Sequence, residues 1–208
     1  MIQRQLQYIV NVALVLVLFV GTAFAQEAGA RTDSEPKMTP EEVAADEKAW
    51  IQTQQNLWEN STPSWTLDEI VREFTVACDA FGWDISQELD GFFYVLFTDF
   101  RAAQHPTWDM RTLEGYAMGM GNPDEVLVYI DVDYFLGLNE IERKALVFHE
   151  LFHDIFNVPH SETGLMMSEG EYPQTQDELI TQTAEVFDVI WAQFNLYQER
   201  LKEQDNGK

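Results

Sequence analysis

Residues 147–160 read VFHELFHDIFNVPH, in which a histidine–glutamate pair is followed by a second histidine and, seven positions later, by a third. On an α-helix, residues four apart lie above one another on the same face, so His149 and His153 can direct two imidazole nitrogens at one metal ion. Glu150 lies one step round the helix, where its carboxylate can act on a water molecule rather than on the metal. The spacing therefore predicts a helix that carries two metal ligands.

The third histidine has to reach the metal from outside that helix. Asn157 and Pro159 favour a helix end, because Asn tolerates the left-handed conformation of helix C-termini and Pro stops a helix shortly after its cap. We expect His160 to arrive from the loop that turns back. Three neutral imidazoles and one open coordination position are typical of a catalytic zinc site.

The alternative to a metal site is a core helix that contains a few polar residues. The neighbours of the motif cover nearly the whole helix circumference with apolar side chains, which predicts burial on most sides; they are Ala145, Leu146, Val147, Phe148, Leu151, Phe152, Ile155 and Phe156. Buried His and Glu side chains without partners cost free energy, and a metal ion removes that cost. Three of the four histidines of the chain lie in this window, which favours the metal site.

The sequence on both sides of the motif extends the pattern. Residues 134–143 read YFLGLNEIER, and residues 164–167 read GLMM. Together with the histidine motif, these segments resemble zincin metallopeptidases, in particular small secreted metzincin-like zinc metallopeptidases, over about residues 92–190. The resemblance implies Zn²⁺ as cofactor, a peptide or protein as substrate, and Met166 as the methionine of a structural turn beneath the metal.

Two features differ from the metzincin pattern. Phe156 stands where that pattern has Gly three residues after the second histidine, and the third histidine falls one residue later. A gluzincin-like arrangement would instead take its third ligand from a downstream helix, with Glu178 as the first candidate. The third ligand is therefore expected to be His160, with Glu178 as the alternative.

The remaining elements predict an α+β fold, in which a small mixed sheet packs on the His149 helix and further helices flank it. Capping signals predict helices that start at Thr39, Thr66, Asn139 and Thr175. A run rich in aromatic and β-branched residues predicts a strand at 92–98, the Gly-rich segment 113–120 is expected to form a second strand, and alternating apolar residues predict a third at 125–132. The strand at 125–132 is apolar on both faces, which predicts a central position. The resemblance suggests that segment 115–120 is an edge strand that pairs with extended substrate; the alternative is an ordinary hairpin arm.

The N-terminal residues predict export. Residues 1–25 combine Arg4, an apolar run and the Ala23–Ala25 cleavage pattern of a signal peptide, so we expect cleavage after Ala25 and a periplasmic or secreted protein. The alternative is an uncleaved anchor. Residues 26–38 are expected to form a flexible lead-in, residues 39–203 a single domain, and residues 204–208 a frayed tail.

The charge and the cysteine content limit the possible partners and cross-links. The chain has 36 acidic and 12 basic residues, a formal net charge of −24, which disfavours nucleic acid and anionic membrane surfaces and suits cationic or neutral peptides better than acidic ones. Cys78 is the only cysteine, so no internal disulfide can form, and its apolar surroundings predict a buried, inert thiol. Asp154, next to His153, is expected at the surface, with the orientation of a histidine ligand as the alternative.

These observations predict zinc-dependent hydrolysis of peptide bonds outside the cytoplasm, with Glu150 as the general base for the attacking water and His149, His153 and His160 as ligands. A second hypothesis is an exported zinc-binding or interaction protein on the same fold that does not turn over substrate. A third is zinc-dependent hydrolysis of a substrate other than a peptide.

Overall fold

The structure is a computed structural model that describes residues 39–101, 113–118, 124–160, 166–168 and 172–206. The predicted signal peptide and the lead-in at 26–38 lie outside the described residues. Within the described ranges, no helix combines the length and the hydropathy needed to cross a membrane. The chain divides into two compact units, Met1–Gln55 and Asn56–Lys208, and every candidate site residue belongs to the second unit.

Helix α2 spans Pro40–Glu59 and begins with the predicted capping box. The backbone N–H of Thr39 donates to the Glu42 carboxylate at 2.7 Å, and the backbone N–H of Glu42 donates to the Thr39 hydroxyl at 3.3 Å. Two backbone donors that have no partner within the helix are satisfied in this way. The prediction of a helix that starts at Thr39 is confirmed.

The sheet of the second unit has four strands in the order β1-β2-β4-β3. The strands are β1 (Thr62–Pro63), β2 (Phe92–Thr98), β3 (Gly115–Ala117) and β4 (Glu125–Asp131). β2 and β4 are parallel, whereas β1 and β3 pair with their neighbours in antiparallel fashion. The predicted α+β class with a small mixed sheet is confirmed, and so are the central position of β4 and the edge position of β3. β3 is shorter than the predicted strand, of which residues 119–120 lie outside the described part.

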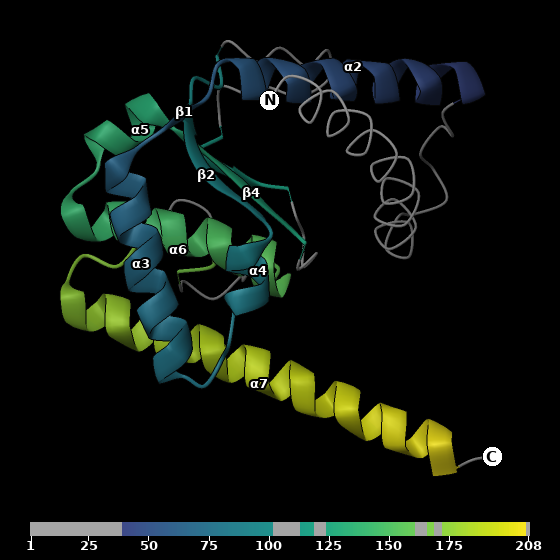
Figure 1. The fold of residues 1–208 in the computed structure, drawn as a ribbon, viewed down its shortest axis with the longest axis vertical. Helices are drawn as coiled ribbons and strands as arrows, with labels where there is room; N and C mark the ends of the chain where they lie inside the picture. Colours follow the sequence, from purple (N-terminus) through teal and green to yellow (C-terminus); the bar gives the residue numbers. More distant parts are fainter. Residues whose placement is uncertain (1–38, 102–112, 119–123, 161–165, 169–171, 207–208) are drawn as a thin grey trace. The chain divides into compact units, whose positions relative to one another are not determined.

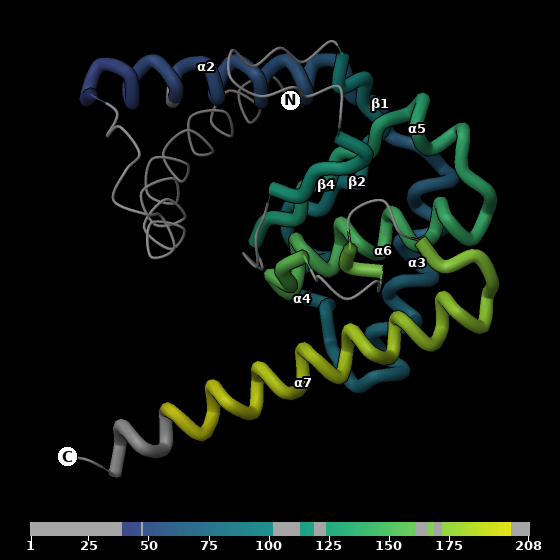
Figure 2. The backbone as a smooth tube through the Cα atoms, turned by 180° about the vertical axis from the view of Figure 1, so that it is seen from behind, coloured from purple at the N-terminus to yellow at the C-terminus, as the bar shows by residue number. Residues whose placement is uncertain are grey.

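The described residues of this unit form five further helices: α3 (Trp65–Ala80), α4 (Ser86–Asp90), α5 (Val132–Gly137), α6 (Glu140–Phe156) and α7 (Gln176–Asn206). α6 contacts β3 and β4, and α3 and α7 contact α6, so that α6 lies between the sheet and α7 (Figures 1 and 2). One predicted boundary was wrong: α3 is capped by the Ser64 hydroxyl rather than by Thr66. α7 extends to Asn206.

The main hydrophobic core fills the space between the sheet, α3, α6 and α7. The Phe152 ring of α6 is fully buried at its centre, with its centroid 5.1 Å from that of Phe74 in α3 and 5.2 Å from that of Phe187 in α7. Cys78 belongs to the same core, and burial raises the pKa of its thiol to about 12, as the sequence predicted for an inert side chain. A second, smaller cluster contains Leu57, Leu96, Phe100, Leu127 and Tyr129, so β4 has buried side chains on both faces.

Candidate metal centre

Capping interactions at the two ends of α6 fix the position of the histidine motif. The Asn139 side chain accepts from the backbone of Glu142 at 3.1 Å, and the Glu142 carboxylate accepts from the backbone of Asn139 at 2.8 Å, which forms a capping box at the start. At the other end Asn157 adopts the left-handed conformation, with φ 52° and ψ 40°, and its N–H donates to the carbonyl of His153. Asn is one of the few residues that tolerate this conformation, so the helix ends here and the chain returns toward its own last turns.

The three motif histidines come together as predicted. His149 Nε2 lies 2.9 Å from His153 Nε2 and 3.2 Å from His160 Nε2, and one ring nitrogen from each residue falls within 4.8 Å of the others. His149 is buried, His153 half-buried and His160 exposed, so the group opens toward solvent at His160. These side chains could hold a metal ion between them.

The other ring nitrogens of the helical histidines are held by backbone carbonyls. His149 Nδ1 lies 2.6 Å from the Met166 carbonyl, and His153 Nδ1 lies 2.5 Å from the Val158 carbonyl. A carbonyl can only accept, so both Nδ1 atoms carry the proton, and both Nε2 atoms of the neutral rings present lone pairs. Two lone pairs 2.9 Å apart repel one another unless a cation lies between them.

Electrostatics keep these rings neutral. Burial lowers the pKa of His149 to about 3, with a further contribution from the neighbouring His153, and burial likewise lowers the pKa of His153 to about 4. Metal binding requires unprotonated imidazole, so His149 and His153 can act as ligands at neutral pH. For a tetrahedral ion with Zn–N bonds of about 2.0–2.1 Å, the ligand nitrogens should be about 3.3 Å apart, which is close to the His149–His160 separation. The His149–His153 separation of 2.9 Å is shorter than this value. The three histidines are therefore side chains that could hold a metal ion.

Glu150 lies beside the histidines with its side chain almost entirely buried, 6% exposed. Burial, followed by the negative charges of Asp154 and Glu114, raises the pKa of Glu150 to about 8. The side chain is pressed against the backbone of β3: a Cβ atom added to Gly115 would lie 2.5 Å from Glu150 Oε1. The absence of a side chain at Gly115 thus gives Glu150 its place beside the edge strand.

Asp154 corrects an expectation from the sequence. Its side chain is fully buried instead of lying at the surface, and its Oδ2 accepts from the backbone N–H of Met118 at 3.0 Å and of Leu127 at 3.3 Å. Asp154 follows His153 on α6 but faces the sheet, where it connects α6 to the ends of β3 and β4. Its part in the site is to fix the helix against the edge strand. No periodicity in the sequence indicates this, because the backbone donors come from strands distant in the chain.

Met166 and Glu178 occupy different roles. Met166 is fully buried, and its backbone carbonyl accepts the His149 Nδ1 proton, so it touches the site through the main chain. Glu178 is exposed and caps α7, where its carboxylate accepts from the backbone N–H groups of Gln174 at 2.8 Å and Thr175 at 3.2 Å. In the described part of the chain, His149, His153 and His160 form the only group of three or more metal-ligating side chains.

Two further residues near the site were not predicted in their observed roles. The Tyr172 hydroxyl donates to Glu114 Oε2 at 2.5 Å. Glu114 directly precedes β3, and its charge contributes to the raised pKa of Glu150. The only sequence signal for Glu114 is its place next to the predicted edge strand. Segment 102–112, which contains the fourth histidine, His105, lies outside the described residues.

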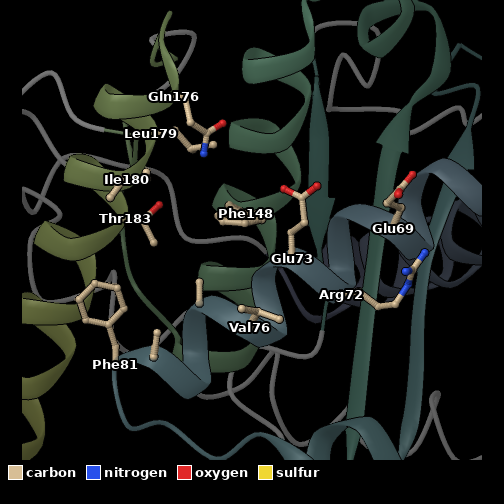
Figure 3. A pocket seen from close by; sticks show the side chains of 12 residues that line it. Glu69, Arg72, Glu73, Val76, Phe81, Phe148, Gln176, Leu179, Ile180 and Thr183 are labelled. Atoms are coloured by element: carbon tan, nitrogen blue, oxygen red, sulfur yellow. The ribbon is translucent and has the colours of Figure 1, made fainter.

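A separate groove is lined by residues of α3, α6 and α7 (Figure 3). Its volume is about 500 Å³, and Phe148 of α6 projects between side chains of α3 and α7. Its lining includes Glu69, Arg72, Glu73, Val76, Leu179, Ile180 and Thr183, and no histidine. Successive helix residues are about 100° apart, so Phe148 and the neighbouring His149 project in different directions from α6.

No protein-family model, curated protein or solved structure matches this chain.

Proposed function

We propose that this protein is an exported zinc metallopeptidase whose ligands are His149, His153 and His160. The observation that carries the proposal is the convergence of ring nitrogens beside a buried glutamate: two of the rings are fixed by backbone carbonyls with their Nε2 lone pairs facing each other. His149, His153 and His160 would hold the ion, and a set of three histidine ligands is typical of catalytic zinc sites.

The residues around the ion have distinct tasks in this proposal. When bound, zinc supplies a Lewis acid that activates water and polarises the scissile carbonyl. Glu150 accepts the proton of the attacking water and returns it to the leaving amine. The carbonyls of Met166 and Val158 orient His149 and His153 and increase their basicity as ligands. Met166 does no chemistry itself.

A peptide is the substrate class that the edge strand favours. β3 is the outer strand of the sheet on that side and contacts α6, and Glu150 lies against its Gly115. An extended peptide can add to such an edge through main-chain hydrogen bonds. A peptide bound there would pass directly over the glutamate that acts as base.

The test combines metal analysis with cleavage of peptides. Residues 26–208 of the wild type should bind one zinc per chain and cleave members of a mixed peptide library, as followed by mass spectrometry. Glu150→Ala should keep the zinc and lose cleavage by at least about 100-fold, since general-base catalysis typically contributes 10²–10⁴-fold. Zinc binding without cleavage of any peptide, amide or ester would instead identify a zinc-binding protein without turnover. Native cleavage rates in Glu150→Ala would overturn the mechanism.

A further inference from the structure

A second acidic side chain lies beside Glu150 at the start of the edge strand. Glu114 precedes Gly115, whose backbone abuts the Glu150 carboxyl group. The Tyr172 hydroxyl donates to Glu114 Oε2 at 2.5 Å and so fixes the direction of the side chain. The Tyr134 side chain also hydrogen-bonds to Glu114. A carboxylate has about four lone-pair positions, so these two hydrogen bonds leave part of the acceptor capacity of Glu114 unused.

Neither carboxyl group has a cationic partner in the described ranges. The ion pairs found there join Arg101 and Lys144 to other acids and include neither Glu114 nor Glu150. Glu150 also accepts no hydrogen bond from these residues, although it is only 6% exposed. A buried carboxyl group without a partner is costly, which indicates that a ligand completes this environment.

The position of the pair defines what that ligand would be. Glu150 follows His149 on α6, and Glu114 stands at the entrance to β3, so a peptide along β3 would run past both carboxyl groups. The Glu114 carboxylate attracts a positive charge and repels another carboxylate. The net charge of −24 adds a field of the same sign.

We propose that Glu114 is a specificity-determining residue that binds a positively charged group of the substrate, an ammonium or guanidinium, near the bond to be cleaved. The inference rests on the proposed function for the reaction, but the binding of the cation needs no catalysis. Glu150 remains the base. The cation can come from a Lys or Arg side chain or from the amino terminus of a peptide.

The test measures binding to the metal-free protein, so that it does not depend on turnover. Alanine pentapeptides capped at both ends would carry one Lys, or one norleucine of similar length, at each position in turn, and NMR titration would give each Kd. An alanine pentapeptide with a free amino terminus, compared with its N-acetylated form, tests whether the amino terminus supplies the positive charge. Wild-type protein should bind at least one cationic peptide about tenfold or more tightly than its neutral counterpart, as expected for a charge-assisted hydrogen bond.

Three variants decide whether Glu114 is responsible. Glu114→Gln should abolish the preference, Glu114→Asp should retain part of it, and Glu185→Gln, which removes an exposed charge on α7, should retain all of it. Zinc content checks that the histidine group of each variant is intact. Equal binding of cationic and neutral peptides by the wild type, or an unchanged preference in Glu114→Gln, overturns the inference.

The same peptides, added to zinc-loaded wild type, separate this inference from the proposed function. Selective binding of cationic peptides without any cleavage would support Glu114 as a cation-binding residue and contradict the proposed peptidase activity. Cleavage of cationic and neutral peptides at the same rate, together with equal binding, would support the peptidase activity and contradict the role of Glu114 in specificity.

Discussion

His149 Nδ1 lies 2.6 Å from the backbone carbonyl of Met166, and this contact joins α6 to a segment 17 residues further along the chain. It assigns the ring proton to Nδ1 and leaves Nε2 free to bind a metal. Because the acceptor is a main-chain carbonyl, the side chain of residue 166 is not needed for it. The fully buried Met166 side chain acts on the site by holding that carbonyl in place.

His160→Ala should weaken zinc binding by more than about 100-fold, because loss of a direct ligand should exceed the 10–100-fold effect typical of the residues that orient ligands. Competition with a chromogenic chelator measures the affinity. Glu178→Ala is the matched control: its carboxylate caps α7, so its zinc affinity should equal that of the wild type. The reverse result would move the third ligand to Glu178.

Glu150→Gln should make the metal-free protein more stable, by an amount that increases with pH. Burial raises the pKa of Glu150 to about 8, above the ordinary value of 4.5, so the folded state binds more protons than the unfolded state between these two values. The wild type therefore loses stability as pH rises from about 4.5 to about 8. The Gln variant does not, because its side chain does not titrate.

Urea unfolding at pH 5, 6.5 and 8 would measure this difference. We expect it to grow to a few kcal/mol, on the order of 1.4 kcal/mol per unit of pKa shift at most. Glu185→Gln, at an exposed position, should show no such trend. Saturating zinc should reduce the trend, because a nearby cation favours the ionised carboxylate. A difference that does not change with pH would mean that Glu150 is not buried as described.

Gly115→Ala should lower peptidase activity by about 10- to 100-fold and leave zinc bound, since a displacement of about 1 Å in a catalytic group can have an effect of this size. The added Cβ would meet three atoms of the Glu150 side chain at 2.5–2.6 Å and displace it. Gly137→Ala is the control, because nothing lies within 4 Å of a Cβ there. Equal activity in both variants would show that Glu150 does not depend on the close approach of β3.

Leu146→Ala should lower the free energy of unfolding by about 2–5 kcal/mol, as for other fully buried leucines. Leu146 is 0% exposed in the main core, one turn before the motif. Leu196→Ala, at a position 56% exposed on α7, should change stability by about 0.5 kcal/mol or less. Chemical denaturation of the metal-free proteins provides both values. Similar losses in the two variants would contradict the packing of α6 against the sheet.

Much of the local structure follows from the sequence because its signals act over a few residues. The capping boxes at Thr39 and Asn139 and the helix end at Asn157 each depend on contacts within about one turn, and all three are observed. The apolar pattern of residues 125–131 likewise indicates a strand covered on both faces, which β4 is. The histidine spacing, read on one helix and the turn after it, predicts the group of three rings.

The environment of these rings depends on contacts between distant segments, and local patterns do not encode them. Asp154 looks like a surface acid beside His153, yet its carboxylate accepts from backbone donors 27 and 36 residues away. Glu114 and Tyr172 are 58 residues apart and meet only because β3 lies at the edge of the sheet next to α6. The chemistry of the motif is therefore a property of its short-range spacing, whereas the burial of Glu150 and its acidic neighbour arise from tertiary packing, which brings backbone and charge together across the fold.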